Sequence, residues 1–213
     1  MRVADEPQSR DVEPRRSAVV HLPLSDSDAG VVAAIRAGER AGGAALYDRH
    51  HQYVRRVLVR VLGPDADLQD LVQDVFVAAI DSIDRLADAG ALRGWLAAIS
   101  VNCVRMELRR RTRRRIIRLL PPSEVPDVAV AARDRELDAA LRVTYHVLGR
   151  LAADERIVFA LRFIEGMELM AIAEVCQVSV ATTKRRLVSA RRKFINMARA
   201  YPELVDWVKD EAP

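Results

Sequence analysis

Apolar residues recur at helical spacing over residues 68–83, and this pattern constrains the fold more than any other feature of the chain. They lie at positions i, i+3, i+4 and i+7, the spacing that places side chains on one face of an α-helix. The stripe consists of Leu68, Leu71, Val72, Val75, Phe76, Ala79, Ile80 and Ile83. A second stripe, which continues into an Arg-rich segment, consists of Leu92, Trp95, Leu96, Ile99, Cys103 and Met106. No segment has a credible strand pattern, so the sequence predicts an all-α protein.

Prolines interrupt the helical pattern between residues 119 and 133. Pro121, Pro122 and Pro126 lie there among residues without a helical period, which is typical of a linker. Residues 1–27 mix charges, Pro and Ser without a period, and we expect them to be disordered. The prediction is two small helical domains joined by a flexible linker. The expected boundaries are 1–27 for an N-terminal extension, 28–118 for the first domain, 119–136 for the linker, 137–199 for the second domain and 200–213 for a tail.

Glycines and cap residues set the expected helix ends. Gly42-Gly43 is expected to separate a helix that begins near Asp28 from a second helix over 44–62. Asp65 and Asp154 are expected to be N-caps, because a side-chain oxygen there can accept from a free backbone N–H of the first turn.

Composition and cysteine spacing exclude several classes of protein. Cys103 and Cys176 lie in different helical patterns, with no Cys or His nearby at metal-ligand spacing, so neither a disulfide framework nor a metal site is expected. No run of 18 apolar residues exists, and residues 1–16 carry charges where a signal peptide needs an apolar core. We therefore expect a cytoplasmic protein without a membrane span.

Nothing in the sequence predicts an enzyme or a cofactor. The chain has no P-loop, no His-Glu-x-x-His and no Gly-rich nucleotide fingerprint. His50-His51 could suggest metal binding or acid–base chemistry, but on an Arg-rich helix such residues are more often solvated.

One face of the helix over 68–83 is almost wholly acidic. The residues on this face are Asp67, Asp70, Asp74 and Asp81, with Gln73 beside them. A charged face can simply keep a helix soluble. In a chain with a net charge of +4, however, an acidic face favours a basic protein partner over DNA.

The end of the next helix is strongly basic. After Asn102, the arginines are Arg105, Arg109, Arg110, Arg113 and Arg114. A run of arginines can be a solvated tail, but its continuity with a helix that has an apolar stripe favours a fixed surface for a phosphate backbone.

Residues 172–192 have the pattern of a helix-turn-helix. A short helix, a tight turn, an N-capping Ser179 and a longer basic helix follow one another, and Ala173 is small enough for the two helices to approach closely. Facing the core we expect Val180, Thr183, Leu187, Ala190 and Phe194. Facing outward we expect Ala181, Thr182, Arg185, Arg186 and Ser189, flanked by Lys184, Arg191 and Arg192. The alternative is an ordinary helical hairpin with a solvated basic face.

These segments together resemble a known family. Asp70-Leu71-Val72-Gln73-Asp74-Val75-Phe76 resembles the polymerase-docking motif of bacterial sigma factors, acidic-Leu-x-Gln-acidic-x-Phe. Trp95-Leu96…Ile99…Asn102, with the arginines that follow, resembles their promoter-melting helix, and residues 172–192 resemble their C-terminal helix-turn-helix. Gln177 stands where the family usually has a turn Gly. The resemblance covers about residues 28–198, with both domains in the expected order, and is to the extracytoplasmic-function (ECF) type.

The resemblance implies a sigma factor that brings RNA polymerase to promoters and helps to melt them. It implies three sets of site residues. Core polymerase would contact Asp67, Asp70, Leu71, Gln73, Asp74 and Phe76. The minus-ten element would contact Asn102, Arg105, Arg109, Arg110 and Arg113. The minus-thirty-five element would contact Ser179, Ala181, Thr182, Lys184, Arg185, Arg186, Ser189 and Arg191.

The partners implied are RNA polymerase core enzyme and promoter DNA, and the family commonly has an anti-sigma factor as well. Two alternatives stay open at this point. One is a helix-turn-helix regulator with a ligand-sensing N-terminal domain, and the other is an enzyme. Co-purification with core polymerase separates both from a sigma factor.

Overall fold

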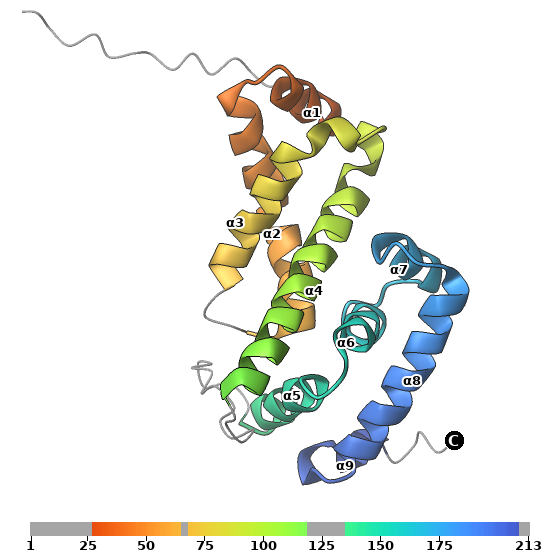
Figure 1. The fold of residues 1–213 in the computed structure, drawn as a ribbon. Coiled ribbons are helices and arrows are strands. Elements are labelled where there is room, and N and C mark those ends of the chain that lie inside the picture. Colours follow the sequence, from red (N-terminus) through yellow and green to blue (C-terminus); the bar gives the residue numbers. More distant parts are fainter. Residues whose placement is uncertain (1–26, 65–67, 119–134, 209–213) are drawn as a thin grey trace, which may run out of the picture.

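The computed structural model describes residues 27–64, 68–118 and 135–208, and these form helices and no strand (Figure 1). The first domain comprises α1 (Asp28–Arg36), α2 (Arg40–Leu62), α3 (Leu68–Asp81), the short turns η1 (Ile83–Arg85) and η2 (Ala89–Ala91), and α4 (Leu92–Arg118). The second comprises α5 (Arg135–Leu148), α6 (Ala153–Phe159), the π-helical turn η3 (Ala160–Ile164), α7 (Leu169–Val175), α8 (Val180–Ala198) and α9 (Pro202–Val208). The predicted all-α fold with two helical domains is confirmed. None of the helices described is long and apolar enough to cross a membrane.

The expected break at Gly42-Gly43 is wrong. The chain turns earlier, at Gly38, whose φ of 75° suits glycine because it has no Cβ. α2 then begins at Arg40 and contains both other glycines. Gly42 is buried where α1 crosses α2, and a Cβ there would lie 2.7 Å from the backbone N of Ile35. Gly42 therefore permits close packing of two helices and does not end one.

This close approach predicts opposite effects for two neighbouring substitutions. Gly42→Ala should lower the free energy of unfolding by about 1–3 kcal/mol, because the new methyl overlaps backbone that cannot move without separating α1 from α2. Gly43→Ala should raise it by up to about 1 kcal/mol, since alanine is the better helix former. The nearest atom to that second methyl is the end of the Ile80 side chain, at 3.3 Å. Urea unfolding followed by circular dichroism measures both, and equal stability of the two variants would contradict the packing argument.

Two stripe residues of the first domain face outward. Met106 is 64% exposed, because the buried face of α4 is centred on Leu96, Val101 and Val104. Ile80 is 39% exposed and lies next to Gly43. The rest of the α3 stripe is buried as predicted.

The histidines of α2 differ from the solvated pair expected. His50 is buried, and its Nε2 lies 3.2 Å from Oδ1 of Asp28, so it joins α2 to the start of α1. His51 stacks on the ring of Tyr47.

Helix ends in the second domain agree in part with the sequence. Ser179 is the N-cap of α8, as predicted, and Gly166 follows the end of η3. The N-cap of α6 is Ala152, so Asp154 lies in the first turn and its carboxylate is free for other partners. The expected cap Asp65 lies outside the described residues. α5 begins at Arg135, two residues before the expected start of the second domain at residue 137.

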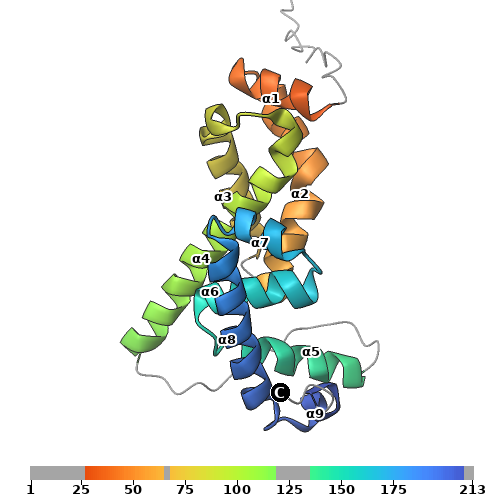
Figure 2. The ribbon, with the colours of Figure 1, turned by 90° about the vertical axis from the view of Figure 1, so that its right-hand side faces the viewer.

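The two domains pack against each other. α6 and α7 contact α4, and η3 contacts α2, as the two views of the ribbon show (Figures 1 and 2). Ile157, Leu161 and Ile172 of the second domain are buried in one apolar cluster with residues of α2 and α4. The apolar core is therefore continuous across the domain boundary.

Polar groups of the second domain also cover the end of α2. The last carbonyls of a helix have no partner within it. The buried Arg156 guanidinium donates to the carbonyl oxygens of Val61 and Leu62, at 2.8 and 3.0 Å, and the Tyr145 hydroxyl donates to that of Val59 at 3.1 Å. These bonds cap α2 from the other domain.

Candidate protein and nucleic-acid interfaces

The acidic face of α3 is open to solvent. Asp70, Gln73, Asp74 and Asp81 are all exposed. Two residues of the predicted docking set, Leu71 and Phe76, are not exposed but buried in the core. They fix the orientation of α3 from its buried side. Asp67 lies outside the described residues.

An exposed apolar side chain lies among these acidic residues, and the sequence reading missed it. Val77 is 58% exposed, three residues after Asp74 and four before Asp81, which puts it on the same face of the helix. The spacing alone was a sufficient signal. An apolar centre with a charged rim is the usual composition of a protein–protein interface.

The outer side of α4 presents a mixed stripe at helical spacing. The exposed members are Met106, Arg109 and Arg113, and the half-buried members are Trp95 and Asn102. This stripe combines an aromatic ring, an amide and arginines, which are the groups that stack on bases, read their edges and bind phosphates.

Arg110, in the Arg-rich C-terminal part of α4, pairs with a carboxylate of the same helix. Its Nε and that of Arg111 donate to the two carboxylate oxygens of Glu107, at 2.5 and 2.7 Å. Burial by itself would raise the pKa of Glu107, but the hydrogen bonds from the two arginines outweigh burial and lower that pKa below its usual range. Glu107 therefore neutralises part of the positive charge of the arginine run, near the residues where that run begins.

The turn and cap of the helix-turn-helix form as predicted. Gln177 adopts a left-handed φ of 55°, which is the conformation for which the family usually has Gly at this turn. The backbone N–H of Thr182 donates to the Ser179 hydroxyl at 3.1 Å, and that hydroxyl donates to Oγ1 of Thr182 at 3.0 Å. Ala173, on the first of the two helices, is buried. The residues of α8 exposed to solvent at this surface include Ala181, Lys184, Arg185 and Arg191.

Two residues of α8 expected to face outward do not. Arg186 Nη2 lies 2.9 Å from Oδ2 of Asp154, and the Ser189 hydroxyl donates to Glu155 at 2.7 Å. The physical reason is that this side of α8 packs against α6. Arg186 is consequently held by its own domain in this structure.

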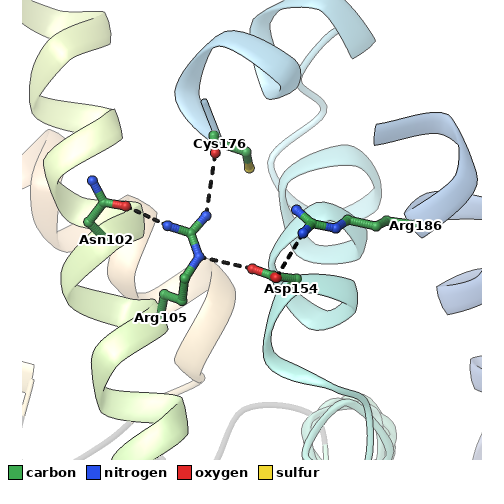
Figure 3. A network of polar contacts seen from close by, with 5 residues as sticks. All are labelled: Asn102, Arg105, Asp154, Cys176 and Arg186. Atoms are coloured by element: carbon green, nitrogen blue, oxygen red, sulfur yellow. Dashed lines mark hydrogen bonds and ion pairs between the residues drawn. The ribbon is translucent and has the colours of Figure 1, made fainter. Parts of the chain in front are cut away.

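Arg105 of α4 belongs to the same polar network (Figure 3). Its Nε lies 2.9 Å from Oδ1 of Asp154, and its Nη1 donates to the side-chain oxygen of Asn102. A longer contact of 3.5 Å joins its Nη2 to the backbone oxygen of Cys176. One carboxylate thus holds an arginine from each of the two predicted DNA-binding helices.

The described residues contain no cluster of His, Cys, Asp and Glu that could hold a metal ion. Cys103 and Cys176 are both buried free thiols. Burial raises the pKa of Cys176 to about 11, and it raises that of Cys103 above its ordinary value. Both therefore stay protonated near neutral pH.

Comparison with known families matches both domains. Residues 46–114 match the family Sigma-70 region 2, and residues 141–194 match Sigma-70, region 4. These ranges contain α3, nearly all of α4 and most of the helix-turn-helix helix α8.

Curated relatives are similar over most of their length. An ECF RNA polymerase sigma-E factor of Haemophilus influenzae is 27% identical over 185 residues, which cover 80% of this chain and 94% of that protein. The ECF RNA polymerase sigma factor SigM of Mycobacterium tuberculosis is 27% identical over 172 residues, covering 80% and 84%.

A solved structure is similar as well. CnrH, in complex with the cytosolic domain of CnrY, superposes with a TM-score of 0.54 at 26% identity, covering 83% of this chain and 99% of that one. These matches favour the sigma-factor interpretation over a ligand-sensing regulator. The chain belongs to the ECF-type sigma factors, which direct RNA polymerase core enzyme to specific promoters during transcription initiation.

Proposed function

We propose that this sigma factor uses three separate surfaces for three different binding roles. The acidic face of α3 docks on core polymerase, the outer stripe of α4 holds the minus-ten element, and the exposed part of α8 reads the minus-thirty-five element. The observation that carries this assignment is the segregation of charge: the exposed face of α3 is acidic, whereas α4 and α8 expose arginines and Lys184. The units are residues 28–118 and 137–199, with 119–136 as linker, 1–27 as an extension and 200–213 as a tail.

Docking through α3 would combine charge with a small apolar contact. Asp70 and Asp74 would attract a basic surface of the polymerase, and Val77 would be buried on contact. Complementary charge raises the association rate and fixes the register of the two surfaces. An apolar centre from which water is excluded slows dissociation. Leu71 and Phe76 would act indirectly, by anchoring α3 in the core.

Recognition by α4 would require single-stranded DNA. Asn102 can donate and accept hydrogen bonds at once, which suits the exposed edge of an unstacked base. Extruding a base costs a few kcal/mol, so stacking on Trp95 and phosphate contacts from Arg109 and Arg113 would offset that cost.

Recognition by α8 would take place in the major groove of duplex DNA. Arg185 can bond bidentately to guanine, whereas Lys184 suits a phosphate. Ser179, Ala181, Thr182 and Arg191 would line the same approach. Because the two domains are joined, binding of one raises the effective concentration of the other.

The remaining partner and location follow from this role. CnrH was solved with the cytosolic domain of CnrY bound, and this chain too would have an anti-sigma factor as partner. The factor would carry no catalytic residue, because the polymerase performs the chemistry. It would act in the cytoplasm, where polymerase and promoters are.

Run-off transcription tests the proposal. Purified core polymerase, genomic DNA fragments and this protein should yield transcripts with discrete start sites, preceded by two shared sequence elements. Core polymerase alone is the control. Transcripts that are no more specific with the protein than without it would overturn the proposal.

A further inference from the structure

Met106 is an exposed apolar residue in the middle of the outer stripe of α4. It is 64% exposed, and it lies four residues after Asn102 and three before Arg109. Residues three and four apart on a helix are neighbours on its surface. Met106 therefore lies between the amide proposed to read a base and an arginine proposed to bind phosphate.

The apolar surface continues from Met106 towards the start of α4. Trp95 and Ile99 lie at the same helical spacing, are half-buried and pack against the core. A single exposed apolar residue is normal on a protein surface. Met106, however, extends a surface that already contains an aromatic ring and an amide and that ends in arginines. Such a surface suits the faces of nucleic-acid bases at one end and phosphates at the other.

Asn102 is held in a fixed orientation next to Met106. Arg105 and Met106 follow Asn102 by three and four residues, so they flank it on two sides. The Arg105 Nη1 donates to the side-chain oxygen of Asn102, and Figure 3 shows the amide nitrogen of Asn102 pointing away from Arg105. The amide nitrogen is thus the group that Asn102 presents to a base.

The distance along the helix suits a strand from which one base has been taken out. Four residues of α-helix rise about 6 Å. Successive bases of one strand lie about 3.4 Å apart, so Asn102 and Met106 are separated by about two stacking steps. Methionine has three rotatable bonds and a thioether that makes favourable contacts with aromatic rings, so its side chain can enter the gap that an extruded base leaves.

We propose that Met106 is a wedge for promoter melting: its side chain enters the base stack beside the base that Asn102 takes out, and keeps that base from returning. Proteins that unstack DNA insert apolar side chains, methionine among them, between base steps. The inference rests on the proposed function, because it takes the outer stripe of α4 as the minus-ten surface. A wedge is needed while the strands separate, and it is not needed once they are apart.

The test compares two substitutions of Met106 with a matched control. Met106→Ala removes the wedge, whereas Met106→Leu keeps an apolar side chain of similar size. Met170→Ala makes the same chemical change at a methionine that is 76% exposed on α7 and is not among the residues proposed to bind DNA or polymerase. Neither alanine variant should lower the unfolding temperature measured by circular dichroism, because both methionines are exposed and alanine is a better helix former.

Strand opening is measured with holoenzyme assembled from core polymerase and each protein. The DNA is a promoter fragment mapped by run-off transcription, in which 2-aminopurine replaces one adenine of the minus-ten region, because the fluorescence of this base rises when it unstacks. A second fragment carries mismatches across the same region, so that its strands are already separate. Binding of holoenzyme to this second fragment is measured by anisotropy.

On the duplex fragment, Met106→Ala should open the strands at least about tenfold more slowly than the wild type, equivalent to about 1.4 kcal/mol in the barrier. Met106→Leu and Met170→Ala should open it at nearly the wild-type rate. All four proteins should bind the mismatched fragment alike. The wedge is overturned if Met106→Ala opens the duplex as the wild type does, if it loses as much on the mismatched fragment, or if the leucine or Met170 variant is equally slow.

The same assay separates failure of the wedge from failure of the proposed function. If the wild type opens the duplex and Arg109→Ala slows opening while Met106→Ala does not, the minus-ten surface stands and the wedge alone is refuted. If the wild type gives neither specific transcripts nor a rise in fluorescence, the proposed function fails, and the wedge fails with it.

Discussion

Replacing both Asp70 and Asp74 by Lys should weaken binding to core polymerase by at least about a hundredfold, equivalent to about 2.8 kcal/mol. Both side chains are exposed on α3, so the expected loss comes from reversing charge against a basic partner surface. The helical content and unfolding midpoint should stay close to those of the wild type, because neither side chain is part of the buried core. Titration of labelled protein with core polymerase gives the affinity directly.

A matched control for this prediction is the pair Asp48→Lys and Asp84→Lys. Both residues are exposed and lie outside α3, and the net charge changes by the same amount. The control should bind core polymerase as the wild type does. Unchanged affinity of the α3 variant, or an equal loss in the control, would show that the docking surface lies elsewhere.

Arg185→Ala should cost about 1–3 kcal/mol of binding to the minus-thirty-five duplex and relax the preference at one base position. Arg185 is exposed on the outer side of α8, whereas its neighbour Arg186 pairs with Asp154. Lys184→Ala should instead weaken binding to all duplexes alike and reduce the dependence on salt by about one unit of slope. The measurement is a set of affinities for single-base variants of a mapped promoter at several salt concentrations.

The contrast between the two substitutions decides the assignment. If Arg185→Ala and Lys184→Ala act equally on every duplex, Arg185 does not read a base. If only Lys184→Ala changes the base preference, the roles of the two residues are exchanged.

The predicted site residues differ in how far the sequence could place them. The acidic face of α3 was predictable, because a helical period assigns every residue to a direction once one buried stripe is known. The same period placed Leu71 and Phe76 in the core, and only the family motif put them among the docking residues. Val77 was missed although its spacing places it on the acidic face, because apolar residues are ordinarily assigned to the core.

Local chemistry alone determined several features of this protein. Helical period predicted the all-α fold, and a cap that depends only on residues three apart, Ser179 and Thr182, predicted the start of α8. The roles of Gly42, Met106 and Asp154 were decided only by tertiary structure, because each role depends on which helix packs beside the residue. Asp154 meets Arg105 and Arg186 across 49 and 32 residues of sequence, and no periodic pattern specifies which distant charges will meet. Packing of α6 against both α4 and α8 makes that choice, and it also decides which of the predicted DNA contacts are free to bind.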